Sequence, residues 1–275
     1  MPSLNDYTAR AIDIPAMPEV AQKLMRSLSR DDLSLQHVAD LVSRDQALAG
    51  KVLRLANSSR FSPARNVATL KDATMVLGLG HLRDLTLSAC LSGALPSPQG
   101  FDRLRHWRGS MAMAAYAQAV AHALGEDQDV AYLGGLMLRS GRILMALVDP
   151  QRCLEVDLHA TVPDSTIGWE ETLMGCSHPQ VSTAIAAHWH FPAVLEDAFR
   201  AAADPLAARP FSRLGAVLRL ASVITDLREA GQDAAVGLAE LQAPLLQHLG
   251  LQIEDLCLHL PPHEQLLENA QQLLH

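Results

Sequence analysis

The chain has 275 residues and a formal net charge of −8 at neutral pH. It contains 46 Leu and 41 Ala but only 16 Val and 7 Ile, so residues that favour helices greatly outnumber those that favour strands. This composition argues against a β-sandwich or β-barrel and, more weakly, against a parallel-sheet fold. An acidic chain with only 22 Lys and Arg is not typical of a protein that binds nucleic acid.

The chain shows no sign of export or membrane insertion. No apolar run approaches about 18 residues, and the N-terminal segment lacks the basic and apolar regions of a signal peptide. The four cysteines are widely spaced and form no CxxC pair, which indicates reduced, mostly buried thiols. We therefore expect a cytoplasmic protein with no membrane partner.

Apolar residues recur at helical spacing through nearly the whole chain. A first helix is expected to begin behind Pro15 and Pro18, because proline is tolerated in the first turn. Asp45 is the expected N-cap of a helix that carries Leu55 on its buried face. Farther on, we expect Gly78 and Gly80 to end a helix that runs through Leu77, because glycine commonly follows the last helical residue.

The segment LPSPQG at 95–100 is the clearest predicted linker, since it holds two prolines and a glycine. Beyond it, a long helix is expected over Arg103–Leu124. The nearly apolar stretch from Val130 to Leu147 is expected to form one continuous, buried helix. Shorter helices follow as far as the ADPLAARP segment at 203–210, which is a second predicted boundary, and another helix is expected from Phe211 to Arg228.

Twelve histidines raise the question of a metal site. Two ligands on one helix need a spacing of three or four residues, and neither His188 with His190 nor His178 with His188 has it. The sequence contains no HExxH motif, no Cys/His cluster with zinc-ligand spacing, no nucleophile motif and no phosphate-binding loop. Most histidines are therefore expected to make ordinary hydrogen bonds, although ligands from distant helices escape this test.

Four stretches of the sequence share their pattern with a known family. They are LRLANSS, TLKDATMVLGLGHLRDLTLSACL, YLGGLMLRSGRILM and GCSHPQVSTAIAAHWHFP. Together they resemble the bacterial HDOD domain, the HD-related output domain, over about residues 13–207. The resemblance implies an all-α, multi-helix bundle of the HD superfamily type. An N-terminal helical part would span 13–95, and a degenerate HD-like part would span 100–207.

HD-type phosphohydrolases bind metal through an early His, an HD doublet and later histidines. The resemblance places the early His on Gly109, with His106 one turn before it, and the HD doublet on Leu138 and Arg139. Leucine offers no ligand atom, and a guanidinium is a fixed cation. Of the later positions, the His-Pro pair is kept as His178-Pro179, whereas the double His falls near Ala201-Ala202. We therefore expect no metal centre and no HD-type hydrolysis.

The family is understood as a bacterial signalling module, often fused to cyclic-dinucleotide enzymes or receiver domains. The resemblance thus implies a non-enzymatic, regulatory protein that binds a protein partner, which could belong to a cyclic-dinucleotide pathway. An alternative is that a vestigial HD pocket binds a small molecule or nucleotide through Arg139, Arg142 and His178. The more ordinary interpretation of the two arginines is that they are solvated charges at a helix end. A third hypothesis is a hydrolase with a rearranged metal site.

Residues 208–275 lie beyond the resemblance and are predicted to form a C-terminal helical extension. We expect its leucines to pack on the same chain and complete the core, and the alternative is that they form a dimer or partner interface. The sequence does not settle the oligomeric state or the partner, and no cofactor is expected. The leucines at helical spacing include Leu238, Leu241, Leu245, Leu246, Leu249 and, farther on, Leu266, Leu267, Leu273 and Leu274.

Overall fold

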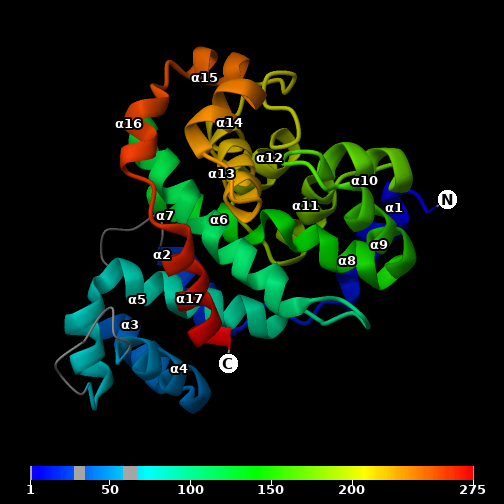
Figure 1. Ribbon diagram of the computed structural model, residues 1–275. Helices are drawn as coiled ribbons and strands as arrows, with labels where there is room; N and C mark the ends of the chain where they lie inside the picture. Colours follow the sequence, from blue (N-terminus) through cyan, green and yellow to red (C-terminus); the bar gives the residue numbers. More distant parts are fainter. Residues whose placement is uncertain (1, 28–34, 58–66, 275) are drawn as a thin grey trace. The chain divides into compact units, whose positions relative to one another are not determined.

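The computed structural model describes residues 2–27, 35–57 and 67–274 (Figure 1). These residues form helices joined by turns and loops, and no strand occurs among them. The all-α prediction is therefore confirmed. The chain divides into two compact units, one made of Met1–Ile14 and Pro96–Leu266, the other of Pro15–Leu95 and Leu267–His275. The division at Leu95 falls within the predicted linker.

In the unit that contains Pro15–Leu95, α5 (Leu70–Ala94) packs against the three helices that precede it. As predicted, Asp45 caps one of these helices, because its carboxylate accepts the N–H groups of Ala47 and Leu48. Leu55 is fully buried, while Ser58 and Ser59 of the LRLANSS motif lie outside the described residues. The preceding helices are α2 (Glu19–Ser27), α3 (Leu35–Ser43) and α4 (Gln46–Ala56).

Gly78 breaks α5 as the sequence predicts, because it has a positive φ of 74° and a non-helical ψ of 169°. A residue with a side chain would be strained in this conformation. The helix resumes directly afterwards and runs to Ala94, so Gly80 does not end it.

The other unit holds the candidate site. Its long helix α6 (Arg103–Leu124) packs against α7 (Gln128–Met137) and α13 (Arg213–Glu229). Its remaining helices are α1 (Leu4–Ala9), η1 (Arg10–Asp13), η2 (Leu138–Ser140), α8 (Gly141–Val148), α9 (Pro150–His159), α10 (Thr166–Met174), α11 (His178–His188), α12 (Ala193–Ala201), α14 (Ala234–Leu241), α15 (Ala243–Leu249), α16 (Ile253–Leu258) and the start of α17 (His263–Leu274).

The prediction of one continuous helix from Val130 to Leu147 is wrong, because the helix is interrupted by η2 at Leu138–Ser140. The cause is Ser182 of α11. Its hydroxyl donates to the carbonyl of Leu138 at 2.6 Å and accepts the N–H of Gly141 at 2.7 Å. A side chain inserted in this way replaces helical hydrogen bonds and allows a sharp change of direction.

Gly141 lets α8 approach α11 closely. A Cβ at this position would lie 2.2 Å from the carbonyl oxygen of His178, well inside contact distance. The stretch Gln128–Val148 is long and apolar enough to cross a membrane by length and composition, but 78% of its most apolar window is buried in the fold. This is the burial expected of core helices.

Residues beyond the resemblance share in the core of this unit. Helix α13 packs on α6, α7 and α12, and most of its residues are buried. Of the predicted leucine stripe, Leu241 is exposed, contrary to the expectation for that residue. The fully or nearly fully buried members in this unit are Leu238, Leu245 and Leu246, and Leu273, which belongs to the other unit, is also fully buried.

Candidate functional site

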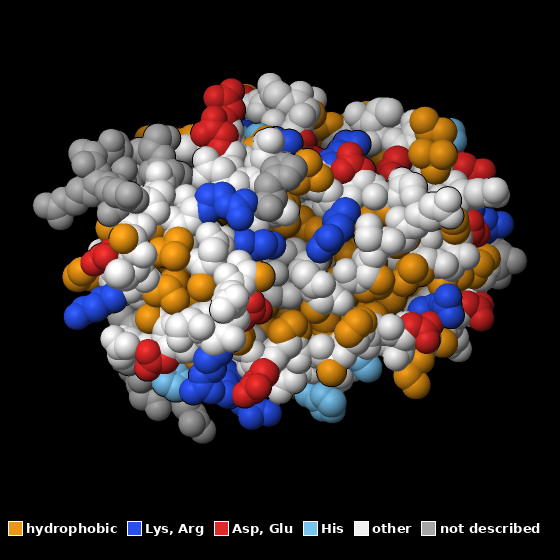
Figure 2. Space-filling view, turned by 90° about the horizontal axis from the view of Figure 1, so that it is seen from below, with side chains coloured by type: hydrophobic (Ala, Val, Ile, Leu, Met, Phe, Trp, Pro, Cys, Tyr) orange, Lys and Arg blue, Asp and Glu red, His pale blue; other side chains and the backbone are white. Residues whose placement is uncertain are grey.

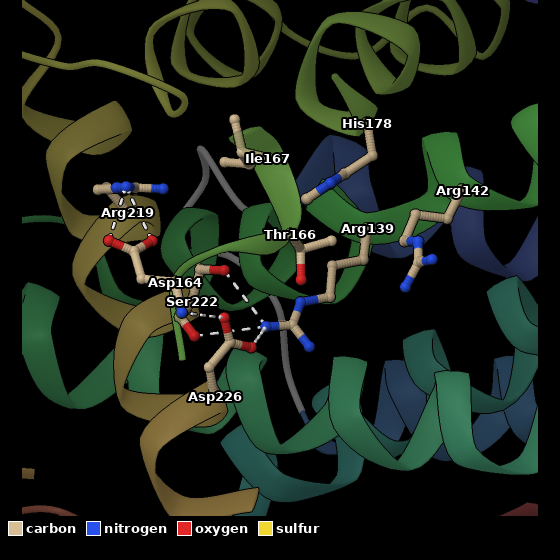
Figure 3. Close-up of a pocket in the computed structure, with 9 residues that line it drawn as sticks. All are labelled: Arg139, Arg142, Asp164, Thr166, Ile167, His178, Arg219, Ser222 and Asp226. Atoms are coloured by element: carbon tan, nitrogen blue, oxygen red, sulfur yellow. Dashed lines mark hydrogen bonds and ion pairs between the residues drawn. The ribbon is translucent and has the colours of Figure 1, made fainter. Parts of the chain in front are cut away.

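A small pocket lies where the interruption at η2 meets the starts of α10 and α11 and the face of α13 (Figure 3). Its volume is about 30 Å³. The pocket brings together Arg139, Arg142 and His178, the three residues that the sequence analysis singled out. The other lining residues, which sequence reasoning missed, are Asp164, Thr166, Ile167, Arg219, Ser222 and Asp226.

Arg139 is held by helix α13. Its Nη2 donates to Asp226 Oδ1 at 2.5 Å and to the carbonyl and hydroxyl oxygens of Ser222 at 3.3 Å each. The side chain is only 15% exposed. Burial alone would lower the pKa of Arg139, but the carboxylates of Asp226 and Glu229 outweigh it and raise that pKa. The interpretation of Arg139 as a solvated helix-end charge is therefore wrong.

The resemblance places the early histidine of an HD site at Gly109. Because glycine has no side chain, other groups fill the space next to it. A Cβ built on Gly109 would lie 2.8 Å from Glu229 Oε1 and 3.7 Å from Arg139 Nη1. A carboxylate and a guanidinium therefore converge there. Neither Gly109 nor Leu138 can ligate a metal, and the guanidinium of Arg139 places a positive charge at the same point.

The residues at these positions therefore do not fit an HD-type metal centre. Ala201 and Ala202, near the later ligand positions, are buried and have no ligand atoms. Within residues 2–27, 35–57 and 67–274, no group of three or more His, Cys, Asp and Glu side chains is placed to hold a metal ion.

His106 lies close enough to Arg139, Arg142 and His178 to be affected by their charges, and its surroundings disfavour the protonated imidazole. Burial, the positive charges of Arg142 and Arg139, and His178 together lower the pKa of His106 to about 3. Its Nε2 is buried and has no hydrogen-bond partner among the described residues. His106 is thus a neutral imidazole over the physiological pH range.

A second network joins His178, Glu170 and Arg142. Glu170 Oε2 accepts both the backbone N–H of His178, at 2.8 Å, and its Nδ1, at 2.7 Å. Arg142 Nε lies 3.3 Å from Glu170 Oε1, and its Nη2 donates to Asp157 at 2.6 Å. Burial alone would raise the pKa of Glu170, but His178 and Arg142 outweigh it and lower that pKa. Arg142 is therefore a paired cation and not a solvated one.

This network fixes the orientation of the His178 ring. Because the ionised carboxylate of Glu170 can only accept a hydrogen bond, Nδ1 carries a proton. The opposite nitrogen, Nε2, has no hydrogen-bond partner in the described part of the chain, although the residue is only 2% exposed. The pocket thus contains one buried ring nitrogen whose hydrogen-bonding capacity is unused.

The far wall of the pocket is an internally paired ion network. Asp164 has a positive φ of 66°, and its carboxylate accepts Arg219 Nη2 at 2.8 and 2.9 Å and Gln242 Nε2 at 2.8 Å. Its backbone N–H donates to Asp226 Oδ2 at 3.2 Å. Burial raises the pKa of Asp164, Asp226 adds to this, and Arg219 opposes it. Asp226 thus links this network to Arg139.

Fold and site together define an all-α protein in which a buried ion pair between Arg139 and Asp226 lies beside a small pocket. The chain belongs to the HDOD domain family, whose profile matches residues 14–205. It is 25% identical over 189 residues to an uncharacterized protein of Treponema pallidum, with 66% of this chain aligned. The alignment spans only 36% of that relative's length.

Solved structures show the same fold. A candidate phosphohydrolase from Shewanella amazonensis is 24% identical, with a TM-score of 0.76 and 97% of each chain covered. A candidate signal transduction protein from Marinobacter aquaeolei is 22% identical, with a TM-score of 0.75, all of this chain covered and 60% of the other. An HDOD domain protein of unknown function from Geobacter sulfurreducens is 22% identical, with a TM-score of 0.66 and coverage of 92% and 99%. At these identities the likeness shows the fold alone.

Proposed function

We propose that this chain is a non-enzymatic regulatory module of bacterial signalling that acts by binding another protein. The observation that carries the proposal is Arg139, whose guanidinium occupies the HD-doublet position and is held there by Asp226. A guanidinium cannot ligate a divalent cation, and a cation of its charge repels one. The chain would therefore use the HD-like fold without HD-type hydrolysis.

The signalling role is supported by membership of the HDOD family and by the name of the Marinobacter relative. The Shewanella relative is named as a candidate phosphohydrolase, but a shared fold does not transfer a reaction. The ligand positions of this chain argue against the same reaction here.

An apolar strip on α9 supports the binding of a protein. Leu154 and Leu158 are one helical turn apart on the same face and are 61% and 69% exposed, and Val162 follows shortly after the helix and is also exposed. Single exposed hydrophobic side chains are common, and Figure 2 shows several on one face of the molecule. Adjacent ones at i, i+4 spacing form a contiguous apolar surface, which is typical of an interaction site.

The test uses the full tagged chain to capture proteins from a lysate of the source organism. The double variant Leu154→Glu/Leu158→Glu replaces the strip with charge, and Val236→Glu is the matched control because Val236 is an exposed residue on α14. We expect the wild type and the control to retain the same protein and the double variant to lose it. Equal retention by all three chains, or no retention above a tag-only column, would contradict the proposal.

A further inference from the structure

We propose that the pocket beside Arg139 is a binding site for a single phosphate group, either inorganic phosphate or the phosphate of a small phosphate monoester. His178 Nε2, Arg139, Arg142 and the start of helix α10 would provide its hydrogen-bond donors. This inference goes beyond the binding of a protein partner and does not depend on it.

The first observation is the unused nitrogen of His178. His178 lines the pocket, is 98% buried, and has no described hydrogen-bond partner at Nε2. An unsatisfied buried polar atom is costly and calls for a ligand or an ordered water. Nδ1 is bonded to the Glu170 carboxylate, so a second proton, on Nε2, would make the ring an imidazolium that is paired with that carboxylate. Such a ring would donate to an anion.

The second observation is the start of α10. Thr166 and Ile167, its first two residues, line the pocket. The first turn of a helix has N–H groups without intrahelical partners, and Ser165 at the N-cap makes no side-chain hydrogen bond to them. An uncapped helix N-terminus carries a partial positive charge and favours phosphate.

Both arginines are held in place by hydrogen bonds or ion pairs, and both keep donor groups for which no hydrogen bond is described. Every hydrogen bond described for Arg139 comes from Nη2. Its Nη1 lies near Gly109, where the Glu229 carboxylate also lies, so Nε is the donor that has neither a described bond nor a nearby carboxylate. For Arg142, Nη2 bonds to Asp157 and Nε lies beside Glu170, and no bond is described for Nη1. Arg139, Arg142 and His178 line the same pocket, and Figure 3 shows the guanidinium of Arg139 turned towards Asp226 and Ser222. Arginine presents several donors in a planar fork, which suits phosphate oxygens.

The acidic residues of the pocket do not form its anion-facing side. Asp164 is engaged by Arg219 and Gln242, and Asp226 is engaged by Arg139 and by the backbone of Asp164. Their carboxylates are thus already bonded to donors on the α13 side. The donors without a described bond belong to η2, α8, α10 and α11.

The size of the pocket limits the ligand. A volume of about 30 Å³ exceeds the roughly 10–15 Å³ that one water needs. It is far below the roughly 300–1,000 Å³ typical of pockets that enclose a whole organic ligand. A single phosphate group suits this space, whereas a complete nucleotide does not. If a nucleotide binds here, we expect that only its phosphate group enters the pocket and that the rest of the molecule stays outside.

The experiment is calorimetric titration of the full chain with inorganic phosphate and, separately, with glycerol phosphate, at constant ionic strength maintained with chloride. His178→Asn is the informative variant, because the asparagine amide can replace Nδ1 as the donor to Glu170 while Nε2 is removed. His190→Asn is its matched control, because His190 is exposed and has a positive φ that asparagine tolerates. Thr166→Val removes a pocket hydroxyl with little change of shape.

We expect the wild type and His190→Asn to bind phosphate with equal affinity, His178→Asn to bind at least tenfold more weakly, and Thr166→Val to bind several-fold more weakly. Binding of glycerol phosphate with the same dependence on His178 would identify a monoester as an accepted source of the phosphate. Saturation by inorganic phosphate alone would restrict the ligand to the free anion.

A readout on the wild type avoids any dependence on the folding of a variant. In a nitrogen-15 NMR titration, phosphate should shift the side-chain Nε2 resonance of His178, and chloride should not. If phosphate gives neither saturable heat nor this shift, a water alone satisfies Nε2 and the proposal is overturned. Equal phosphate affinity in His178→Asn, Thr166→Val and the wild type would overturn it as well.

Discussion

Replacing Gly141 by alanine should destabilise the fold, because α8 and α11 touch at this residue. The added Cβ would lie 2.2 Å from the carbonyl oxygen of His178 and 2.8 Å from both the backbone nitrogen and the hydroxyl of Ser182. Ordinary contacts of this kind are about 3.4–4 Å, so the helices must separate by about 1 Å or more. Two of the three atoms are backbone atoms, which cannot rotate away.

The magnitude follows from two contributions. Overpacking of a well-packed contact costs about 1–3 kcal/mol. The hydrogen bond from the Gly141 N–H to Ser182 contributes about 0.5–1.5 kcal/mol and would be strained or lost. The free energy of unfolding should therefore fall by about 2–4 kcal/mol. In a domain of this size that corresponds to a decrease in Tm of about 5–15 °C.

Gly168→Ala is the matched control, measured by the same thermal unfolding assay. Gly168 lies inside α10, is exposed, and has no atom within 4 Å of a built Cβ. Alanine is a better helix former than glycine, so this variant should be stabilised by up to about 1 kcal/mol. Opposite signs for two identical substitutions are the expected result. An unchanged Tm for Gly141→Ala would refute the close contact between α8 and α11.

Three further outcomes are expected. Leu55→Ala should lower the free energy of unfolding by about 2–5 kcal/mol, because Leu55 is fully buried in α4; a Tm equal to that of the wild type would mean that the side chain is exposed. Burial and the neighbouring cations lower the pKa of His106 to about 3, so its imidazole should remain neutral in an NMR titration down to pH 5. The free energy of unfolding should decline as pH falls from about 6.5 towards 3, because His106 binds a proton more tightly in the unfolded chain than in the folded one. His106→Phe should lessen that decline, and ordinary titration of His106 near pH 6.5 would contradict the burial argument. A chain truncated after Arg209 should be insoluble or melt without cooperativity, because it loses α13 and with it the partner of α6 and α7; a soluble truncated chain with a sharp transition would show that the core is complete without these residues.

Local signals in the sequence predicted local structure well. The Asp45 cap, the break at Gly78 and the burial of Leu55 each depend on residues within a few positions along the chain. The interruption at Leu138–Ser140 could not be predicted in this way. Its cause is the hydroxyl of Ser182, which is 44 residues from Leu138 in the sequence. The apolar residues on either side of the interruption keep the spacing of a continuous helix, so the sequence gives no local sign of it.

The candidate site shows the same limit. The family pattern singled out Arg139, Arg142 and His178, and the structure places all three on one pocket. Their charge partners could not be found, because Asp226 is 87 residues from Arg139 and lies beyond the resemblance. Without its partner, an arginine at a predicted helix end is most simply interpreted as solvated. Buried ion pairs between distant helices leave no periodic signal in a sequence.

The metal content of the purified full chain tests the central claim most directly. We propose that Arg139, which is paired with Asp226, replaces a metal ligand of HD-type phosphohydrolases, so that the chain binds no metal. Elemental analysis of protein prepared without chelators should find no stoichiometric transition metal, and a phosphodiesterase assay on the same sample should show no activity that a chelator removes. One or two metal ions per chain, together with chelator-sensitive hydrolysis, would contradict the account.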